Sequence, residues 1–252
     1  MIRVVLLGAG NVAIHLARAM QVSDKIELVQ YYSRSLENSS YFDPEIKHTD
    51  NLNNLEDADI YILALKDEVV EEFSKRLTHV KGLVVHTSGS LDLTALSSLS
   101  RSGVLYPIQT FTKERSFSLK TIPFGLECTN SEDIKLLKSM ASILTDHPFE
   151  LDSQARKRIH LAAVFANNFS NYMFTISKQL CDDNNLSFDL LKPIIKETAE
   201  KINYMSPEEA QTGPARRNDH MIMETQEAQL NSDLREIYRM ISRSIQNKYN
   251  QH

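Results

Sequence analysis

The first thirteen residues, M-I-R-V-V-L-L-G-A-G-N-V-A, constrain the fold most, because they combine a buried strand, a glycine turn and the start of a helix. Val4 to Leu7 form an apolar run without polar alternation, which is typical of a strand buried on both faces of a parallel sheet. Gly8, Gly10 and Ala13 then have the spacing of a nucleotide-binding turn. The two glycines allow a tight turn and a close approach of pyrophosphate, and the alanine allows close helix packing.

The surroundings of this turn favour a dinucleotide site over an ordinary β-turn, which would also use two glycines. Asn11 and Val12 open a segment with apolar residues at helical spacing, and its free N–H groups are suited to phosphates. A second strand-like run, Ile26 to Tyr32, follows. We therefore predict that the turn binds a dinucleotide.

The residues after the second run indicate which dinucleotide. An NAD site places a carboxylate there for the ribose hydroxyls, whereas this chain has Ser33, Arg34 and Ser35. The planar guanidinium of Arg34 is suited to a phosphate, although a solvated loop arginine is the alternative. Glu27 lies too early in the strand to reach the ribose. The sequence favours NADP(H) over NAD.

Strand and helix signals divide the chain at about residue 152. Residues 1–152 alternate apolar runs with amphipathic segments, which predicts an α/β domain with a Rossmann-like doubly wound sheet. The expected strands are 3–7, 26–32, 60–65, 83–86, 103–105, 124–128 and 148–151, and the expected helices include 68–80, 91–99 and 134–144. Residues 153–252 predict an all-α C-terminal domain with helices at 153–181, 187–202, 220–227 and 232–247. Pro193 predicts a kink or a later start of the second of these.

The first helix of the C-terminal part is nearly all apolar from Ile159 to Ile176. A helix that is apolar around most of its circumference is buried on several sides. In a domain of about a hundred residues, pairing with a second subunit is the simplest way to bury it, so we expect a homodimer through the C-terminal helices.

Composition excludes several other classes of protein. The 252 residues carry a formal net charge of −5 with no run of basic residues, so neither nucleic acid nor a membrane is an expected partner. The two cysteines, Cys128 and Cys181, are far apart, and no cluster has metal-ligand spacing, so no metal is expected. No signal peptide or membrane-spanning stretch is evident, and we expect a cytoplasmic protein.

Polar residues in the apolar helix are candidates for chemistry. Asn167 and Asn171 each lie within about 20° of His160 on an ideal helix, and Asn168 lies roughly 80° away. For Asn167 and Asn171 we favour a helix-to-helix polar contact, whereas His160 is suited to moving the proton that accompanies hydride transfer.

Two loops are further candidates. Thr212-Gly213-Pro214-Ala215-Arg216-Arg217-Asn218-Asp219 could bind a substrate carboxylate or could simply link two helices. His86-Thr87-Ser88-Gly89-Ser90 follows a buried strand at the edge where ligands bind, and Ser90 could also cap a helix that starts at Leu91. Tyr106 ends the next strand and is a candidate donor or a packing residue.

The order of the motifs G-A-G-N-V-A, H-T-S-G-S, Y-P-I-Q-T-F, H-L-A-A-V-F-A-N-N-F and T-G-P-A-R-R-N-D resembles the Rossmann-like proteins with a DUF2520 C-terminal domain, a family of NADP oxidoreductases. The chain is more distantly similar to pyrroline-5-carboxylate reductases, coenzyme F420-dependent NADP reductases and β-hydroxyacid dehydrogenases. The resemblance implies cofactor contacts at Gly8, Gly10, Asn11, Val12, Ser33, Arg34, Leu65 and Lys66, to which the strand-end position adds Ser88. It implies further site residues at His160, Asn168, Thr212, Arg217 and Asp219.

Together these features favour an NADP(H)-dependent oxidoreductase that acts on a small polar substrate held between its two domains. His160 would donate the proton, Asn168 would orient the substrate, and Arg217 would anchor a carboxylate. The alternative is a nucleotide-binding sensor without catalysis. It is supported by Val164, which holds the position of the catalytic lysine of the β-hydroxyacid dehydrogenases if Asn168 corresponds to their asparagine.

Overall fold

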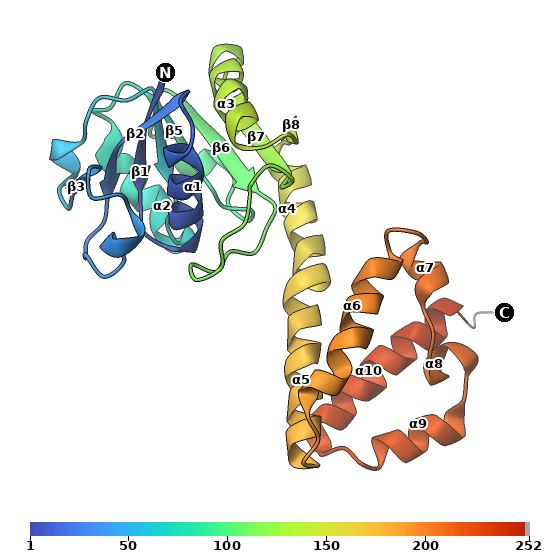
Figure 1. Cartoon of the computed structure of the whole chain (residues 1–252). Helices are drawn as coiled ribbons and strands as arrows, with labels where there is room; N and C mark the ends of the chain where they lie inside the picture. The colour runs from blue at the N-terminus through green and yellow to red at the C-terminus, as the bar shows by residue number, and fades with distance from the viewer. Residues whose placement is uncertain (250–252) are drawn as a thin grey trace. The chain divides into compact units, whose positions relative to one another are not determined.

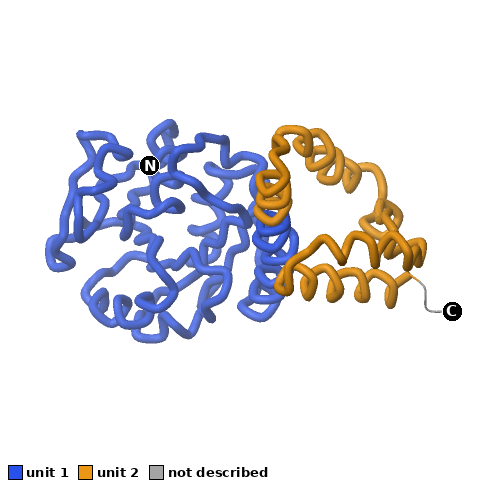
Figure 2. The backbone as a smooth tube through the Cα atoms, turned by 90° about the horizontal axis from the view of Figure 1, so that it is seen from below, with its two compact units in different colours: residues 1–173 blue, residues 174–252 orange. Residues whose placement is uncertain are grey.

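The computed structural model describes residues 1–249, which form two compact units. The first covers residues 1–173 and the second begins at Phe174 (Figure 2). Within the described residues, no helix is long and apolar enough to cross a bilayer.

One eight-stranded sheet forms the centre of the first unit (Figure 1). Its strand order is β3-β2-β1-β4-β5-β6-β7-β8, and only the β6–β7 pair is antiparallel. The order 3-2-1-4-5-6 at one side is that of a dinucleotide-binding fold, and it reverses direction next to β1. The predicted fold class, a Rossmann-like sheet followed by a largely helical region, is confirmed. The strands are β1 (Ile2–Leu7), β2 (Ile26–Tyr32), β3 (Lys47–Thr49), β4 (Ile60–Leu63), β5 (Leu83–His86), β6 (Ser102–Pro107), β7 (Phe124–Cys128) and β8 (Pro148–Glu150).

The strand β1 is buried on both faces, as its unbroken apolar run predicts. Val4 and Leu6 belong to a core that includes α1 (Asn11–Gln21) and α3 (Ser131–Leu144). Val5 and Leu7 belong to a second core that includes α2 (Asp67–Ser74) and the 3-10 turn after it. Successive side chains therefore anchor β1 between two layers, and this fixes the position of the turn that follows it.

Two local predictions in the first unit are wrong. The strand β3 was not predicted, because the sequence K-H-T carries no apolar pattern. The expected helix 91–99 is only a 3-10 turn, Leu93–Leu96, capped by the Asp92 side chain rather than by Ser90. The serine and threonine side chains of this segment compete for backbone hydrogen bonds and disfavour an α-helix.

A long helical segment follows β8. It consists of α4 (Ser153–Ala163), a π-helical stretch (Val164–Phe169) and α5 (Ser170–Asp183). The change from strand to helix falls at the predicted boundary of 152/153, whereas the compact units divide at Met173. The start of α4 belongs to the first unit because Arg156 is fully buried there and forms an ion pair with Glu127 of β7. The domain assignment 1–152 and 153–252 stays a prediction.

The apolar helix is not buried within the single chain. Leu161, Phe165 and Phe169 are 60%, 63% and 49% exposed. A single chain therefore does not cover the face that the sequence marks as apolar.

Helices alone make up the second unit over residues 174–249. After α5 they are α6 (Lys192–Lys201), α7 (Pro207–Ala210), α8 (Pro214–Arg217), α9 (His220–Glu227) and α10 (Ser232–Tyr249). A 3-10 turn, Phe188–Leu191, precedes α6, whose first turn holds Pro193. The later helix start expected from this proline is confirmed, since a proline is tolerated where its missing N–H has no partner.

Candidate functional site

The turn between β1 and α1 has the geometry of a phosphate cradle. Gly8 has φ +123°, and a Cβ there would lie 2.3 Å from the Ala64 carbonyl oxygen, so no other residue fits. A Cβ at Gly10 would meet nothing within 4 Å. Gly10 is also the N-cap of α1 and supplies no side-chain cap, so the first N–H groups of the helix, at Asn11 and Val12, remain available. The open space at Gly10 and these donors fit a pyrophosphate.

A cavity of about 1090 Å³ opens beside this turn, within the first unit. It is lined by Gly8, Ala9 and Gly10 of the turn, by Tyr32, Ser33, Arg34, Ser35, Glu37 and Asn38 after β2, by Leu65 and Lys66 after β4, and by Glu68, Val69, Glu72, Phe73 and Arg76 of α2 and the following turn. Six residues predicted to contact the cofactor, Gly8, Gly10, Ser33, Arg34, Leu65 and Lys66, thus lie around one space.

Arg34 and Ser33 differ in what their side chains are free to do. The Ser33 hydroxyl donates to the Ser35 carbonyl at 2.7 Å and lies 3.1 Å from His48 Nε2, so it holds the loop together. The exposed guanidinium of Arg34 has no hydrogen-bond or ion-pair partner among residues 1–249. The guanidinium of Arg34 can therefore receive an anion here.

The remaining predicted cofactor contacts do not line the cavity with their side chains. The Asn11 side chain donates to the Phe111 carbonyl at 2.9 Å, which leaves only its backbone for a phosphate. The Ser88 hydroxyl accepts from the N–H groups of Ser90 and Leu91, both at 3.0 Å, and so stabilises its own turn. The cofactor contacts of Asn11, Val12 and Ser88 stay predictions. Those of Asn11 and Val12 would be made by their backbone N–H groups.

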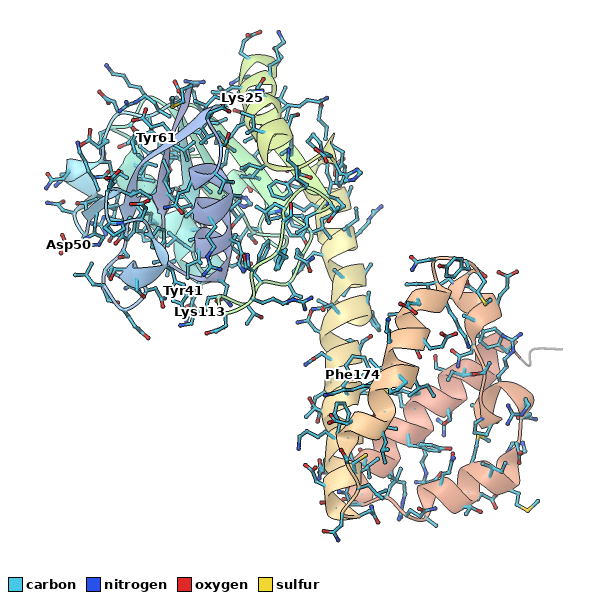
Figure 3. All side chains as sticks on the ribbon, in the orientation of Figure 1. Lys25, Tyr41, Asp50, Tyr61, Lys113 and Phe174 are labelled. Atoms are coloured by element: carbon cyan, nitrogen blue, oxygen red, sulfur yellow. The ribbon has the colours of Figure 1, made fainter. Side chains whose placement is uncertain are left out.

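A loop crosses α1 beside the nucleotide turn and is fixed by one face of that helix. Besides Asn11, His15 bonds to the Thr112 carbonyl at 3.0 Å, and Arg18 donates to the Lys113 carbonyl at 3.0 Å. Lys113 in turn lies over the Tyr41 ring, 5.6 Å from its centroid (Figure 3). We call residues 111–113 the α1 strap.

His160 contacts Tyr106 at the carboxyl end of β6. The Tyr106 hydroxyl lies 3.1 Å from His160 Nδ1, and the two rings meet edge-on. Tyr106 is 7% exposed, and burial raises its pKa, so the hydroxyl keeps its proton at neutral pH. A Cβ on Gly89 would lie 2.5 Å from His160 Nδ1, which means that the H-T-S-G-S turn needs glycine to admit the imidazole.

A buried histidine, His86, supports the turn that carries Gly89. The His86 side chain at the end of β5 is fully buried, and its Nδ1 accepts from the Ser88 N–H at 3.2 Å. Burial, and secondly the nearby Arg156 guanidinium, lower the pKa of His86 to about 4. His86 is therefore neutral at physiological pH and positions the turn that carries Gly89.

Asn168 lies in the π-helical stretch, where it is exposed. Each residue of a π-turn rotates the helix by less than the 100° of an α-helix, so Asn168 lies closer to the His160 face than the 80° expected. Such π-turns occur frequently at functional sites. Asn167 and Asn168 are both exposed in the single chain.

Thr212, Arg217 and Asp219 belong to the second unit, around the short helix α8. Thr212 and Arg217 are exposed, whereas the Asp219 carboxylate accepts from the Ile222 N–H at 3.2 Å and caps α9. The capping bond gives Asp219 a local structural role. Their assignment to a substrate site stays a prediction.

Sequence reasoning missed the wall of the cavity that α2 forms. The range 68–80 was expected only as a helix, yet its residues Val69, Phe73 and Arg76 line the cavity. The signal was present in the spacing 69, 72, 73 and 76, which places these residues on one helix face. Within residues 1–249, no group of three or more His, Cys, Asp and Glu side chains is arranged to hold a metal ion.

Comparison with known proteins agrees with this geometry. Residues 3–88 match the family model described as "NADP oxidoreductase coenzyme F420-dependent", and residues 122–245 match a domain of unknown function, DUF2520. The structure of a "putative NADP oxidoreductase" from Bacteroides fragilis is 37% identical in sequence, with TM-score 0.90 and 98% of each chain covered. No curated protein sequence matches the chain.

Pyrroline carboxylate reductases share the fold at lower identity. The enzyme from Streptococcus pyogenes has TM-score 0.64 at 12% identity, with 98% of each chain covered. The enzyme from Plasmodium falciparum, solved with NADP bound, has TM-score 0.59 at 15% identity, with 97% of this chain and 98% of that chain covered. The chain belongs to the family of NADP-binding, oxidoreductase-like proteins that join a Rossmann-like domain to a DUF2520 domain.

Proposed function

We propose that the protein is an NADP(H)-dependent oxidoreductase acting on a small polar substrate. The observation that carries this proposal is the cavity at the β1–α1 turn, where a glycine cradle and an unpaired Arg34 meet the requirements of a pyrophosphate and a 2′-phosphate. The family relation supports the same nucleotide. The bound cofactor would supply or accept the hydride.

The proton that accompanies hydride transfer is assigned to His160. Proton transfer at Nε2 interconverts the imidazolium and the neutral Nδ1–H tautomer, and the Tyr106 hydroxyl can accept from Nδ1–H in both states. Tyr106 is thus a positioning residue for His160. Asn168, about two helical turns away, would orient the substrate.

The cofactor assignment is tested by fluorescence titration of NADPH and NADH. We expect Arg34→Ala to weaken NADPH binding by about ten- to a hundredfold and to leave NADH nearly unchanged, because a hydrogen bond to a charged group contributes about 1.5–3 kcal/mol. Arg158→Ala is the control, since this arginine is exposed and does not line the cavity. Equal losses for both nucleotides would refute the phosphate role of Arg34.

The alternative is a sensor that binds NADP(H) without catalysis, for which Val164 in the lysine position is the specific support. NADPH oxidation with carbonyl and imine substrates separates the two functions. If the protein is an enzyme, His160→Ala should lose turnover and keep its affinity for NADPH. Tyr106→Phe should then shift the pH dependence of turnover. A sensor binds NADPH and remains inert with or without the histidine.

We also propose that the protein forms a homodimer. Over residues 174–249 only Ala215 and Met223 have buried apolar side chains, which is too small a core for an independently stable unit. Leu161, Phe165 and Phe169 of the first unit are exposed apolar side chains as well. A second copy is the simplest partner, because every chain then carries the complementary surface.

Sedimentation at micromolar concentration tests the dimer. We expect wild-type protein to sediment as a dimer and Phe165→Glu as a monomer, since a carboxylate in an apolar interface lacks a partner. Val22→Glu, at an apolar residue after α1 that is 87% exposed, is the control and should remain dimeric. A monomeric wild type would remove the proposal.

A further inference from the structure

One face of α2 and the turn after it borders the nucleotide cavity. Val69, Glu72, Phe73 and Arg76 all line this space at the spacing of a single helix face. The apolar pair Val69 and Phe73 supplies a surface, whereas Arg76 at the end of the face supplies a cation. The cofactor contacts assigned above to the glycine turn and to the loop after β2 do not include Arg76.

Arg76 lacks an internal partner although an acid lies one turn before it. Glu72 has the i,i+4 spacing to Arg76, yet its carboxylate bonds to Lys75 at 3.0 Å. Lys75 also lies 3.6 Å from Glu71, and these two acids raise the pKa of Lys75. The guanidinium of Arg76 is exposed and has no hydrogen-bond or ion-pair partner among residues 1–249.

A ring contact joins the segment that carries Arg76 to the segment that carries Arg34. Tyr32 at the end of β2 meets Phe73 edge-on, with centroids 5.4 Å apart. Arg34 follows Tyr32 by two residues, and Arg76 follows Phe73 by one helical turn. The contact therefore holds the two arginine-bearing segments on neighbouring walls of one cavity.

Two unpaired guanidinium groups beside one cavity can together bind an anion with more than one acceptor oxygen. The acids Glu37, Glu68 and Glu72 line the same space. Glu72 is paired with Lys75, and Glu68 lies in the first turn of α2, where the helix N-terminus stabilises it. A dianionic phosphate can accept from both arginines at once, whereas a ribose hydroxyl gives little compensation for two cations.

We propose that Arg76 is a second determinant of cofactor specificity, which binds the 2′-phosphate of NADP(H) together with Arg34. This inference rests on the proposed function, because it assumes that the cavity holds the adenosine end of the dinucleotide. It assigns a phosphate-binding role to the turn after α2, on a wall of the cavity that neighbours the loop after β2.

Calorimetric titration with two fragments, adenosine 2′,5′-bisphosphate and 5′-AMP, tests the proposal without relying on activity. We expect wild-type protein to prefer the bisphosphate, and Arg76→Ala to weaken it about tenfold while 5′-AMP changes less than about twofold. Arg76→Lys keeps the charge but loses the planar fork and should fall between the two. Arg158→Ala should behave as wild type.

The outcomes separate this inference from the proposed function. If wild-type protein binds both fragments equally, the NADP assignment fails and the role of Arg76 fails with it. If wild-type protein discriminates and Arg34→Ala removes the discrimination while Arg76→Ala retains it, the role of Arg76 alone is refuted. Loss of both fragments in Arg76→Ala also refutes the role, since it indicates a structural effect.

Discussion

The buried neutral His86 predicts a specific loss of stability on acidification. Its pKa of about 4 in the folded protein lies below the value of 6.5 for an unperturbed histidine. Between these values the unfolded chain binds more protons than the folded chain, so the free energy of unfolding falls as the pH falls. The contribution is complete above pH 6.5 and is lost progressively down to pH 4.

The magnitude follows from the shift of about 2.5 units. Linkage gives a loss of about 2 kcal/mol by pH 5 and about 3 kcal/mol by pH 4, relative to pH 7. The cause is first the burial of His86 and then the Arg156 guanidinium, which a protonated imidazole would face as a like charge. Asp92, whose pKa is lowered to about 2 mainly by its bond to Lys157, loses its contribution at lower pH and does not mask the effect.

Urea unfolding followed by far-UV circular dichroism, at intervals from pH 7 to pH 4, measures this loss. His86→Asn removes the titrating group and keeps an acceptor for the Ser88 N–H, so its stability should fall less over the same range. His147→Asn changes an exposed histidine and should track wild type. Parallel curves for wild type and His86→Asn would refute the argument.

Three further outcomes are expected. Arg156→Met should lower the free energy of unfolding by about 3–5 kcal/mol, because it leaves Glu127 without its buried partner; a Met variant as stable as wild type in urea would contradict this. Gly8→Ala should destabilise the protein by about 1–3 kcal/mol and weaken NADPH binding, because the new Cβ meets a carbonyl oxygen; unchanged titrations would show that the turn relaxes. Burial raises the pKa of Cys128 to about 12, so Cys128→Ser should leave the number of thiols reacting rapidly at pH 8 unchanged.

Periodicity predicted most of the first unit because its strands are buried on both faces. The range 26–32 and the range 83–86 match β2 and β5 exactly, since each is rich in apolar residues and ends at a polar loop. The edge strand β3 was missed because it is short and carries no apolar side chains on a buried face. The π-helical stretch at Val164–Phe169 was also missed, because apolar spacing does not separate i+4 from i+5 bonding.

The sequence predicts those parts of the candidate site that a local motif determines. It does not predict the parts that depend on contacts between residues far apart in the chain. Gly8, Gly10 and Arg34 follow from spacing alone. The bond between Tyr106 and His160 joins residues 54 apart in the chain, and no local pattern encodes it. Arg76 was overlooked because the range 68–80 was assigned only as a helix, although one of its faces borders the cavity.

The position of the α1 strap is determined by side chains of the helix that it crosses. Asn11, His15 and Arg18 recognise three successive main-chain carbonyls, which are the same whatever side chains residues 111–113 carry. The path of the loop is thus encoded in the helix that it crosses, about a hundred positions earlier in the chain. The three bonds do not depend on the side chains of the strap, although Phe111 and Lys113 also contact His15 and Tyr41 through theirs. A single deletion in the strap would put every later carbonyl out of register with its donor.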